Sequence, residues 1–261
     1  MKFDLSKVEF NKNDIKNNTK IPPRLNEKLA HFIGIHLGDG HLNKKVHDYR
    51  MYYNGHFINE FEWYHSFLTN LIYELFNKKV TPSKGHNTIM IVFSSKAIHS
   101  FLNKVCELPI GSKSNCDVPD IIKESNKNIK RAFLRGLADT DFSLVFKNRH
   151  KNINYYPVID HHTPNKKLSK SIVDLLLNLG FNIHSGERLM KREDKFHKSC
   201  YFQINGVKAL EKWMREIGFT SNNQLTKLKV WRKFGFLPPG TNIKDRINML
   251  NGKKDIKSFR K

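Results

Sequence analysis

Two matched segments of the chain, residues 32–40 and 134–142, each carry an acid at the same position. In both segments a glycine is followed four positions later by a small residue, and the acid comes directly after it. The members of this pattern are Gly34, Gly38 and Asp39 in the first segment and Gly136, Thr140 and Asp141 in the second. Carboxylate oxygens are the ligands that Mg²⁺ prefers in proteins. The pattern therefore predicts that Asp39 and Asp141 together hold divalent cations.

The apolar runs that lead to the two acids predict a pair of buried helices. The run 25–40 is too long for a typical strand, and the run 132–140 matches it. Residues four apart lie on one helix face, so the small residues of each segment would let two helix backbones approach closely. An acid at a helix C-terminus is disfavoured by the helix dipole, and a second acid beside it adds repulsion. A cation between Asp39 and Asp141 would relieve both effects. The alternative is that the two acids are only turn or cap residues at the ends of buried helices, but this alternative does not explain the matched glycines.

The charge of the chain indicates a polyanionic partner. It contains 46 Lys and Arg against 24 Asp and Glu, which gives a formal net charge of +22 and a pI near 9.9. A field of this sign favours nucleic acid. The alternative is that a Lys-rich composition reflects an AT-rich genome rather than a binding partner.

The sequence contains no segment that would take the protein into a membrane. There is no apolar run of 18 or more residues, and residues 1–10 lack the apolar core of a secretion signal. We therefore expect an intracellular protein without a membrane partner, in the cytoplasm or nucleoid, or in an organelle matrix if the host is eukaryotic. The three cysteines form no CxxC pair, which argues against disulfides and structural zinc.

The same order of predicted elements occurs twice along the chain. Each copy reads as a helix, two strands, a helix, two strands and a helix, and folded structure is expected to begin near Leu25. The divisions are a lead-in segment at 1–24, a first half at 25–120, a second half at 121–240 and a basic tail at 241–261. Two local signals predict where the second helix of each half begins: Asn59 with Glu62 resembles a capping box, and Pro164 suits a first helical turn.

The segments 32–40 and 134–142 resemble the two copies of the LAGLIDADG motif in single-chain LAGLIDADG homing endonucleases. The match in element order spans residues 25–235. It implies an α+β fold of two pseudo-symmetric αββαββα halves, with the motif helices at their interface and two antiparallel sheets forming a DNA-binding saddle. It also implies a monomeric enzyme that is encoded in an intron and acts in intron homing. Such an enzyme uses Mg²⁺, or Mn²⁺ as a substitute, to hydrolyse both strands of double-stranded DNA at a long, specific site.

The resemblance assigns roles to particular residues. Asp39 and Asp141 are the catalytic, metal-binding acids, with Gly38 and Thr140 as further candidate metal ligands. Lys113 and Lys227 stand near the end of each half, where the family has a lysine that organises water or stabilises charge on the phosphate. Candidate DNA-binding residues on the strands are Arg50, Tyr52, Asn54, Lys84, Lys147, Arg149, Arg188, Lys191, Tyr201 and Gln203.

The two segments depart from the motif in two places, and the second departure keeps a second function open. Leu37 stands where the first acid of the motif name would be, while the second copy keeps Asp139 there. Phe142 replaces the usual final glycine, which can adopt a positive φ that Phe does not readily adopt. The alternative is therefore a non-cleaving RNA splicing maturase or DNA-binding regulator on the same fold, and the host intron RNA is an additional candidate partner.

Overall fold

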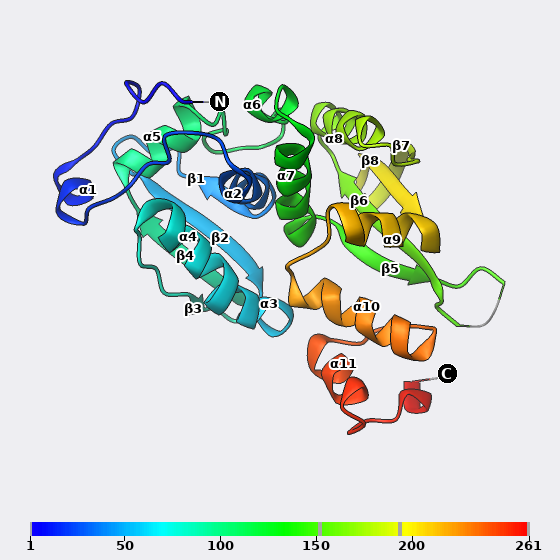
Figure 1. Cartoon of the computed structure of the whole chain (residues 1–261). Coiled ribbons are helices and arrows are strands. Elements are labelled where there is room, and N and C mark those ends of the chain that lie inside the picture. The colour runs from blue at the N-terminus through cyan, green and yellow to red at the C-terminus, as the bar shows by residue number, and fades with distance from the viewer. Residues whose placement is uncertain (1, 151–152, 193–194, 260–261) are drawn as a thin grey trace.

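A computed structural model describes residues 2–150, 153–192 and 195–259 of the chain, without the side chains of residues 190–192, 195, 257 and 259. Two four-stranded antiparallel sheets lie on either side of a central pair of helices (Figure 1). The central helices are α2 (Glu27–Gly38) and α7 (Lys127–Thr140), which pack against each other. The architecture confirms the predicted α+β class with one unit present twice.

The first half contains one sheet and the helices that cover it. The strands have the order β1-β2-β4-β3 and are β1 (Gly40–Leu42), β2 (Arg50–His56), β3 (Ser83–Lys84) and β4 (Thr88–Ser94). Between β2 and β3 the chain forms α3 (Phe57–Trp63), the π-helical turn η1 (Tyr64–Leu68) and α4 (Thr69–Phe76) without a break. The half ends with α5 (Lys96–Lys104).

The second half repeats this plan with a longer second hairpin. Its strands have the order β5-β6-β8-β7 and are β5 (Ser143–Lys147), β6 (Tyr156–Thr163), β7 (His184–Arg192) and β8 (Lys195–Asn205). Its covering helices are α8 (Lys166–Asn178) and α9 (Val207–Glu216). The short helix α6 (Asp120–Lys123) leads into α7.

Each sheet has one face covered by helices and one open face. In β2, Met51 and Tyr53 are fully buried, whereas Tyr52 and Asn54 between and beyond them are not. The same alternation runs through β5, where Leu144 is buried and its neighbours are partly or fully exposed. Because successive side chains of a strand point to opposite faces, the alternation leaves one polar surface on each sheet.

The helices after β2 and β6 begin elsewhere than the local signals predict. His56 caps α3, and Asn59 accepts a hydrogen bond from the backbone of Ile243 at 3.1 Å instead of forming a capping box. In the second half Asn165 is the N-cap of α8, so Pro164 precedes the helix rather than lying in its first turn. Both predictions were wrong because a tertiary contact or a better cap competed with the local pattern.

The segment before Leu25 is part of the folded structure, contrary to expectation. Phe3 packs edge-on against Phe101 with ring centroids 5.6 Å apart. Asp14, in the short helix α1 (Lys12–Lys16), is buried and accepts a hydrogen bond from the Ser95 hydroxyl at 2.6 Å. The segment 2–24 is mostly polar, but Phe3 packs against α5 and Asp14 binds the N-cap of α5, and these two contacts attach the segment to the first half.

The C-terminal segment is also folded onto the second half. It follows α10 (Asn222–Phe234) and contains α11 (Ile243–Leu250) and the 3₁₀ turn η2 (Ile256–Phe259). Arg246 is buried and donates to the Thr226 hydroxyl at 3.0 Å and to the Thr241 carbonyl at 2.6 Å. The division of the chain at residues 24, 120 and 240 remains our proposal. Within the described ranges, no helix is both long and apolar enough to cross a bilayer.

Candidate functional site

Helices α2 and α7 meet through their glycines. A Cβ placed on Gly34 would lie 2.1 Å from the carbonyl oxygen of Phe133, and one on Gly136 would lie 2.0 Å from that of His31. Each glycine thus faces the backbone of the other helix with no room for a side chain. A Cβ on Gly38 would meet Thr140 Oγ1 at 2.0 Å, so the close approach continues to the C-terminal ends.

The two acids lie where the paired helices end. Asp39 caps α2 and its N–H donates to the carbonyl of Ile35 at 3.0 Å, while Asp141 caps α7 and donates to Leu137 at 2.8 Å. A Cβ on Gly38 would lie 3.3 Å from Cγ of Asp141, which brings the second acid against the end of the first helix. The structure therefore brings both acids into one place at the C-terminal ends of the two helices.

The surroundings of the two acids disfavour their charged forms. Burial raises the pKa of Asp39 well above its usual range, and the carboxylates of Glu60 and Asp141 raise it further. Burial raises the pKa of Asp141 to about 6, although Lys113 acts against the shift. The Asp141 side chain is open to solvent on one side, so water screens part of this cost. A divalent cation would lower the energy of both carboxylates.

The oxygen donors at this place fit a hard cation such as Mg²⁺. Such an ion accepts one or two protein carboxylates and keeps several waters or substrate oxygens as its remaining ligands. Within the described part of the chain, no group of three or more Asp, Glu, His or Cys side chains is placed to hold a metal alone. Asp39 and Asp141 would therefore hold the ion together with water and a phosphate.

Lys113 reaches the end of α2 from the loop after α5. Its ammonium donates to the carbonyl of Leu37 at 2.9 Å and also to that of Gly38. Burial lowers the pKa of Lys113, and the carboxylates of Asp141 and Asp39 act against that shift. The lysine therefore lies beside both acids, and it engages the Gly38 carbonyl that was a candidate metal ligand. Thr140, the other such candidate, donates its hydroxyl to the Leu137 carbonyl at 3.1 Å.

Lys227 lies in α10 and has different neighbours. It donates to Oε1 of Gln224 at 3.2 Å, and Gln224 in turn holds the carbonyl of Phe142 at 2.9 Å. Burial and the charge of Arg246 together lower the pKa of Lys227 to about 8, and Glu60 acts against this shift. The charged neighbours of Lys227 are thus Arg246 and Glu60, whereas those of Lys113 are the two acids.

Phe142 lies in the core of the second half and does not fill the site. It is 1% exposed and packs against Phe202 with ring centroids 5.1 Å apart. Neither Phe142 nor the matching Gly40 has a positive φ, so the substitution requires no strained backbone. A Cβ on Gly40 would lie 2.5 Å from Nδ1 of His36, which shows that His36 fills in the first half the space that Phe142 fills in the second.

His161 is buried beside Phe142 without a hydrogen-bond partner. It is 1% exposed, both ring nitrogens are unpaired in the described structure, and the ring stacks on Phe202 at 5.0 Å. Burial and the neighbouring His162 together lower the pKa of His161 to about 4, although Asp160 acts against the shift. Such a group is neutral in the core and destabilises the fold when it must take up a proton.

Replacing His161 with Phe will stabilise the protein and flatten its pH dependence. The folded pKa lies below the ordinary value of 6.5, so the unfolded chain binds the proton first as the pH falls. Stability is therefore lost between pH 6.5 and about 4, by about 3 kcal/mol in all. Urea unfolding at pH 7 and pH 5 will show a smaller loss for His161→Phe than for wild type. An equal loss in both, or the same change in the exposed control His86→Gln, would contradict this.

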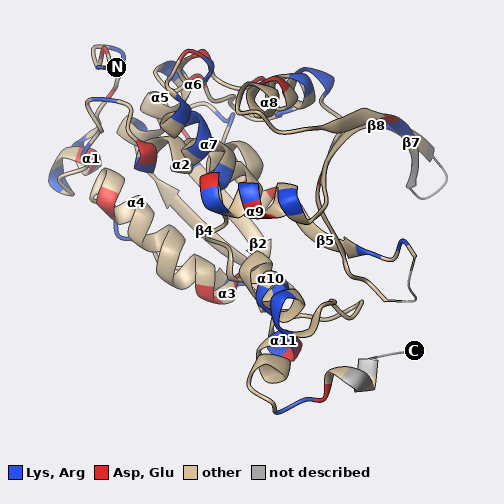
Figure 2. Cartoon of the chain, turned by 45° about the vertical axis from the view of Figure 1, so that its right-hand side comes forward, with Lys and Arg blue, Asp and Glu red and all other residues tan. Residues whose placement is uncertain are grey.

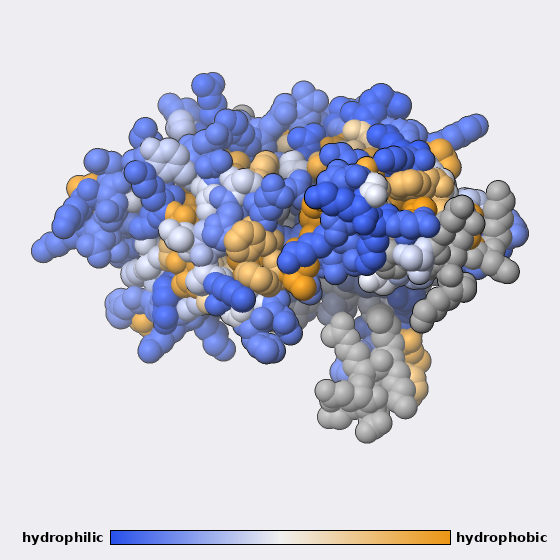
Figure 3. All heavy atoms as spheres, turned by 90° about the horizontal axis from the view of Figure 1, so that it is seen from below, coloured by the Kyte–Doolittle hydropathy of each residue, from blue (hydrophilic) through white to orange (hydrophobic). Residues whose placement is uncertain are grey.

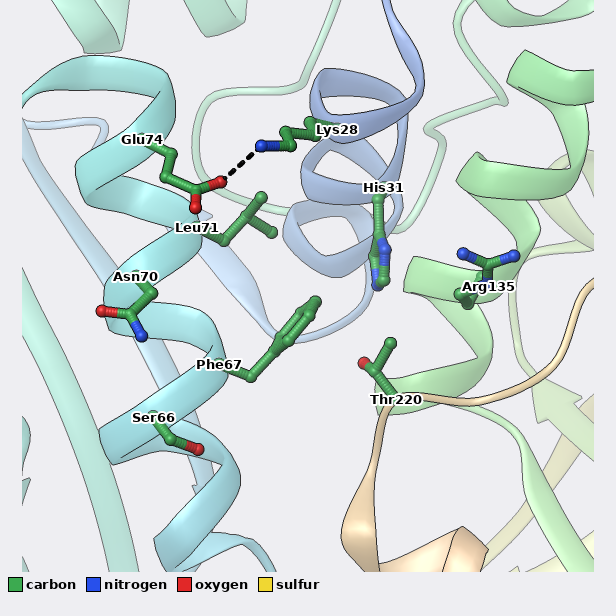
Figure 4. Close-up of a pocket in the computed structure, with 9 residues that line it drawn as sticks. All are labelled: Lys28, His31, Ser66, Phe67, Asn70, Leu71, Glu74, Arg135 and Thr220. Carbon is green, nitrogen blue, oxygen red and sulfur yellow. Dashed lines mark hydrogen bonds and ion pairs between the residues drawn. The ribbon is translucent and has the colours of Figure 1, made fainter.

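Asp139 holds the start of α10 rather than a metal. It accepts hydrogen bonds from the backbone of Ser221 at 2.8 Å, the backbone of Thr220 at 2.7 Å and the ring of His31 at 3.0 Å. His31 and Thr220 line a cavity of about 480 Å³ between α2, α4 and α7, where Figure 4 shows both side chains pointing inward beside Arg135. Neither Asp39 nor Asp141 lines this cavity.

Most of the predicted DNA-binding residues lie on the open sheet faces or at their edges. Those on or beside the open faces are Arg50, Tyr52, Asn54, Lys147, Arg149, Arg188, Tyr201 and Gln203. Lys84 differs, because it pairs with the buried Ile89 and so projects to the helix side, 4.6 Å from the ring of Phe57. The side chain of Lys191 lies outside the described part of the structure.

The open face of the second sheet also carries polar residues that the sequence reading had not assigned to DNA. Asp160 accepts a hydrogen bond from Gln203 at 3.1 Å, and the guanidinium of Arg188 donates to His162 at 2.9 Å. His184 lies opposite Gln203 on the same face. The alternation of Asp160, the buried His161 and His162 is the strand signal that could have identified this row.

The surface is basic over much of the second half. Figure 2 shows Lys and Arg on α8, α9 and α10, whereas α4 is mostly uncharged. Seen from below, hydrophilic residues cover most of the molecule, and hydrophobic residues form separate patches near the middle (Figure 3). A surface of this kind, on a chain of net charge +22, suits a polyanion.

Solved structures with a similar fold include homing endonucleases. A structure of mesophilic variants of the homing endonuclease I-DmoI superposes with a TM-score of 0.52 at 18% identity, covering 74% of this chain and 95% of that one. An I-DmoI variant bound to its target DNA, nicked in the coding strand and with manganese, gives 0.51 at 17% identity over the same shares. The chain shares the fold of the LAGLIDADG homing endonucleases.

The sequence comparisons are much weaker than the structural ones. No family model matches the chain. Glutamine–fructose-6-phosphate aminotransferase from Methanocaldococcus jannaschii is 22% identical over 217 residues, which is 82% of this chain. The chain spans only 18% of the length of that relative, so the relative's activity is not transferred to it. The assignment of the LAGLIDADG fold to this chain therefore rests on the order of its elements, the central helix pair and the structural superpositions.

Proposed function

We propose that this chain is a site-specific DNA endonuclease that hydrolyses both strands with divalent cations held by Asp39 and Asp141. The proposal rests mainly on one observation. The two carboxylates lie together at the C-terminal ends of α2 and α7, and the glycines of each helix contact the backbone of the other. The LAGLIDADG fold supports it, because the superposed I-DmoI structures include complexes with target DNA and manganese or calcium.

The residues around the acids have complementary roles in this proposal. Asp39 and Asp141 hold Mg²⁺, or Mn²⁺ in its place, and the ion supplies a polarised phosphate and an activated water. Lys113 fixes the end of α2 and places a positive charge where charge grows on the phosphate. Lys227 is a second candidate for this role, and its acidic neighbour is Glu60.

The open sheet faces are the proposed DNA-reading surfaces. Arg188 and Gln203 suit bidentate contacts to guanine and adenine in the major groove. The hydrogen bond from Gln203 to Asp160 at 3.1 Å fixes the amide, which makes this pair a candidate for reading one base. The proposal extends to a monomer that acts in intron homing inside the cell, with its own intron RNA as a further candidate partner.

The buried position of Phe142 removes the observation that favoured a non-cleaving maturase or regulator. Its side chain packs against Phe202 and Trp213 in the core of the second half. The second carboxylate therefore has the same helix-end position as the first. The endonuclease is the function that the geometry supports best.

The DNA-binding part of the proposal is tested by selection from a library of randomised duplexes in EDTA. We expect one long duplex to be enriched, and its log affinity to fall with log salt at a slope of roughly −7 if about eight phosphates are neutralised. Filter binding or fluorescence anisotropy between about 50 and 300 mM salt measures the slope. A slope near zero, or equal affinity for all duplexes, would contradict a specific DNA-binding saddle.

A further inference from the structure

Asp39 has a hydrogen-bond donor beside its carboxylate that the sequence motif does not include. Tyr64 is fully buried, and its hydroxyl donates to Oδ2 of Asp39 at 3.4 Å. This is longer than the ordinary O–H···O distance of about 2.7 Å, so the contact holds the carboxylate loosely. In the described part of the chain, the Tyr64 hydroxyl has no other hydrogen-bond partner.

A glycine in β2 makes room for this contact. A Cβ on Gly55 would lie 2.5 Å from Cε2 of Tyr64 and 2.5 Å from Oε2 of Glu60. Both side chains therefore converge over the bare backbone of Gly55. Glu60 is fixed there by the backbone N–H of His56, which donates to its Oε2. The strand, the acid and the tyrosine form one packed unit next to Asp39.

A π-helical turn begins at Tyr64. The helix after β2 is α-helical up to Trp63, becomes π-helical over Tyr64–Leu68 and returns to α-helix at Thr69. A π turn adds a residue to a helix and changes the direction of the side chains around it, and such turns are frequent at functional sites. The irregularity thus coincides with the residue that contacts Asp39.

Asp141 has no equivalent hydroxyl donor beside its carboxylate in the described part of the chain. The carboxylate of Asp141 receives no side-chain hydrogen bond among the described residues, and the groups that act on its pKa are the buried surroundings and the charge of Lys113. The two acids are alike in position on their helices but unlike in their surroundings.

From this asymmetry we propose that Tyr64 is a positioning residue for Asp39, and that it makes the two halves of the site unequal. The hydroxyl orients the first carboxylate toward a cation, while the Asp141 carboxylate has the charge of Lys113 nearby and receives no side-chain hydrogen bond among the described residues. This inference rests on the proposed function for its effect on DNA strands, but its effect on cation binding does not need cleavage. Loss of the hydroxyl should affect one strand more than the other.

The test compares Tyr64→Phe with Tyr53→Phe, which removes a buried tyrosine hydroxyl bonded to His36 at 2.7 Å and not to either acid. Binding of Mn²⁺ alone is measured by its electron paramagnetic resonance signal, and nicking and linearisation are followed on a supercoiled plasmid with the selected duplex. We expect Tyr64→Phe to weaken Mn²⁺ binding several-fold, to slow one strand's cleavage about tenfold and to accumulate nicked plasmid.

Each result decides between the inference and the proposed function. Unchanged Mn²⁺ affinity in Tyr64→Phe, equal slowing of both strands, or the same defects in Tyr53→Phe would overturn the positioning role. If wild type binds Mn²⁺ yet cuts neither strand, the proposed function fails, and a weaker Mn²⁺ affinity in Tyr64→Phe still supports the positioning role. Duplex affinity and unfolding temperature, measured on both variants, separate a local effect from a loss of fold.

Discussion

Substituting Asn for either Asp39 or Asp141 will abolish double-strand cleavage while leaving DNA binding intact. Each substitution removes a negative oxygen ligand from a cation that is expected to lower the barrier by several kcal/mol, which corresponds to at least about a thousandfold in rate. Single-turnover cleavage and duplex affinity are measured on the same preparations. Asp174→Asn, which removes the same charge from the exposed face of α8, should cut as wild type does. Full cleavage by Asp39→Asn or Asp141→Asn would contradict the assigned roles.

The same two substitutions should make the metal-free protein more stable. Burial raises the folded pKa of both carboxyls above the unfolded value, and like charges add to the shift of Asp39, so the unfolded chain loses the protons first as the pH rises. The folded state is therefore destabilised as the pH passes from about 4 through about 6. The unfolding temperature of Asp141→Asn in EDTA should exceed that of wild type at pH 7, and the difference should shrink toward pH 4. A lower unfolding temperature at pH 7 would mean that the carboxylate is stabilised in the free protein.

Replacing Gly34 or Gly136 with Ala will strongly destabilise the fold. In a free helix the change from Gly to Ala would stabilise by up to about 1 kcal/mol, so a loss of stability must come from packing. The added Cβ atoms would lie 2.1 Å and 2.0 Å from carbonyl oxygens of the facing helix, and a backbone cannot rotate away as a side chain can. We expect a loss of about 3 kcal/mol and a fall of roughly 10 °C in unfolding temperature.

Urea unfolding of both variants measures this effect. The matched control is Gly85→Ala in the β3–β4 turn, where the nearest atom is the rotatable hydroxyl of Thr88 and the change should stay within about 1 kcal/mol. Wild-type stability in Gly34→Ala and Gly136→Ala would mean that α2 and α7 do not approach each other this closely. Because the acids follow these helices directly, the variants should also lose cleavage in proportion to the loss of folded protein.

The sequence predicted the helix pair and the element order because these features repeat. A glycine, a small residue and an acid at the same spacing occur in both halves, and the periodic apolar residues around them indicate the same elements twice. The acids could be singled out because an acid at the end of a buried helix is locally unfavourable. The repeat within this one chain thus gave the kind of information that an alignment of related sequences usually gives.

The consequence of Phe142 could not be read from the motif. Compared position by position, Phe142 replaces Gly40 and Ala138 replaces His36, which looks like two unrelated changes. In the structure one large side chain fills the space beside each helix end, from His36 in the first half and from Phe142 in the second. The packing beside each helix end therefore requires one large side chain, but a different position of the motif supplies it in each half.

The surroundings of Asp39 were also beyond the sequence. The contact of Tyr64 with Asp39 depends on the π turn at Tyr64 and on the bare backbone of Gly55, and neither has a periodic signal. The resemblance assigns Lys227 to the site, but the register of α10 puts it beside Glu60 and Arg246. Likewise Lys84 projects to the helix side because of its pairing with Ile89, which the strand pattern alone does not fix.

The central claim is that the two helix-end acids cut DNA with a divalent cation, and plasmid linearisation tests it most directly. A supercoiled plasmid carrying the selected duplex is incubated with excess protein in Mg²⁺ and, in parallel, in EDTA. The account predicts linear DNA cut at the selected site in Mg²⁺ and intact supercoiled DNA in EDTA. Plasmid that is bound tightly but stays supercoiled in both Mg²⁺ and Mn²⁺ would contradict it and leave a DNA-binding protein on the endonuclease fold.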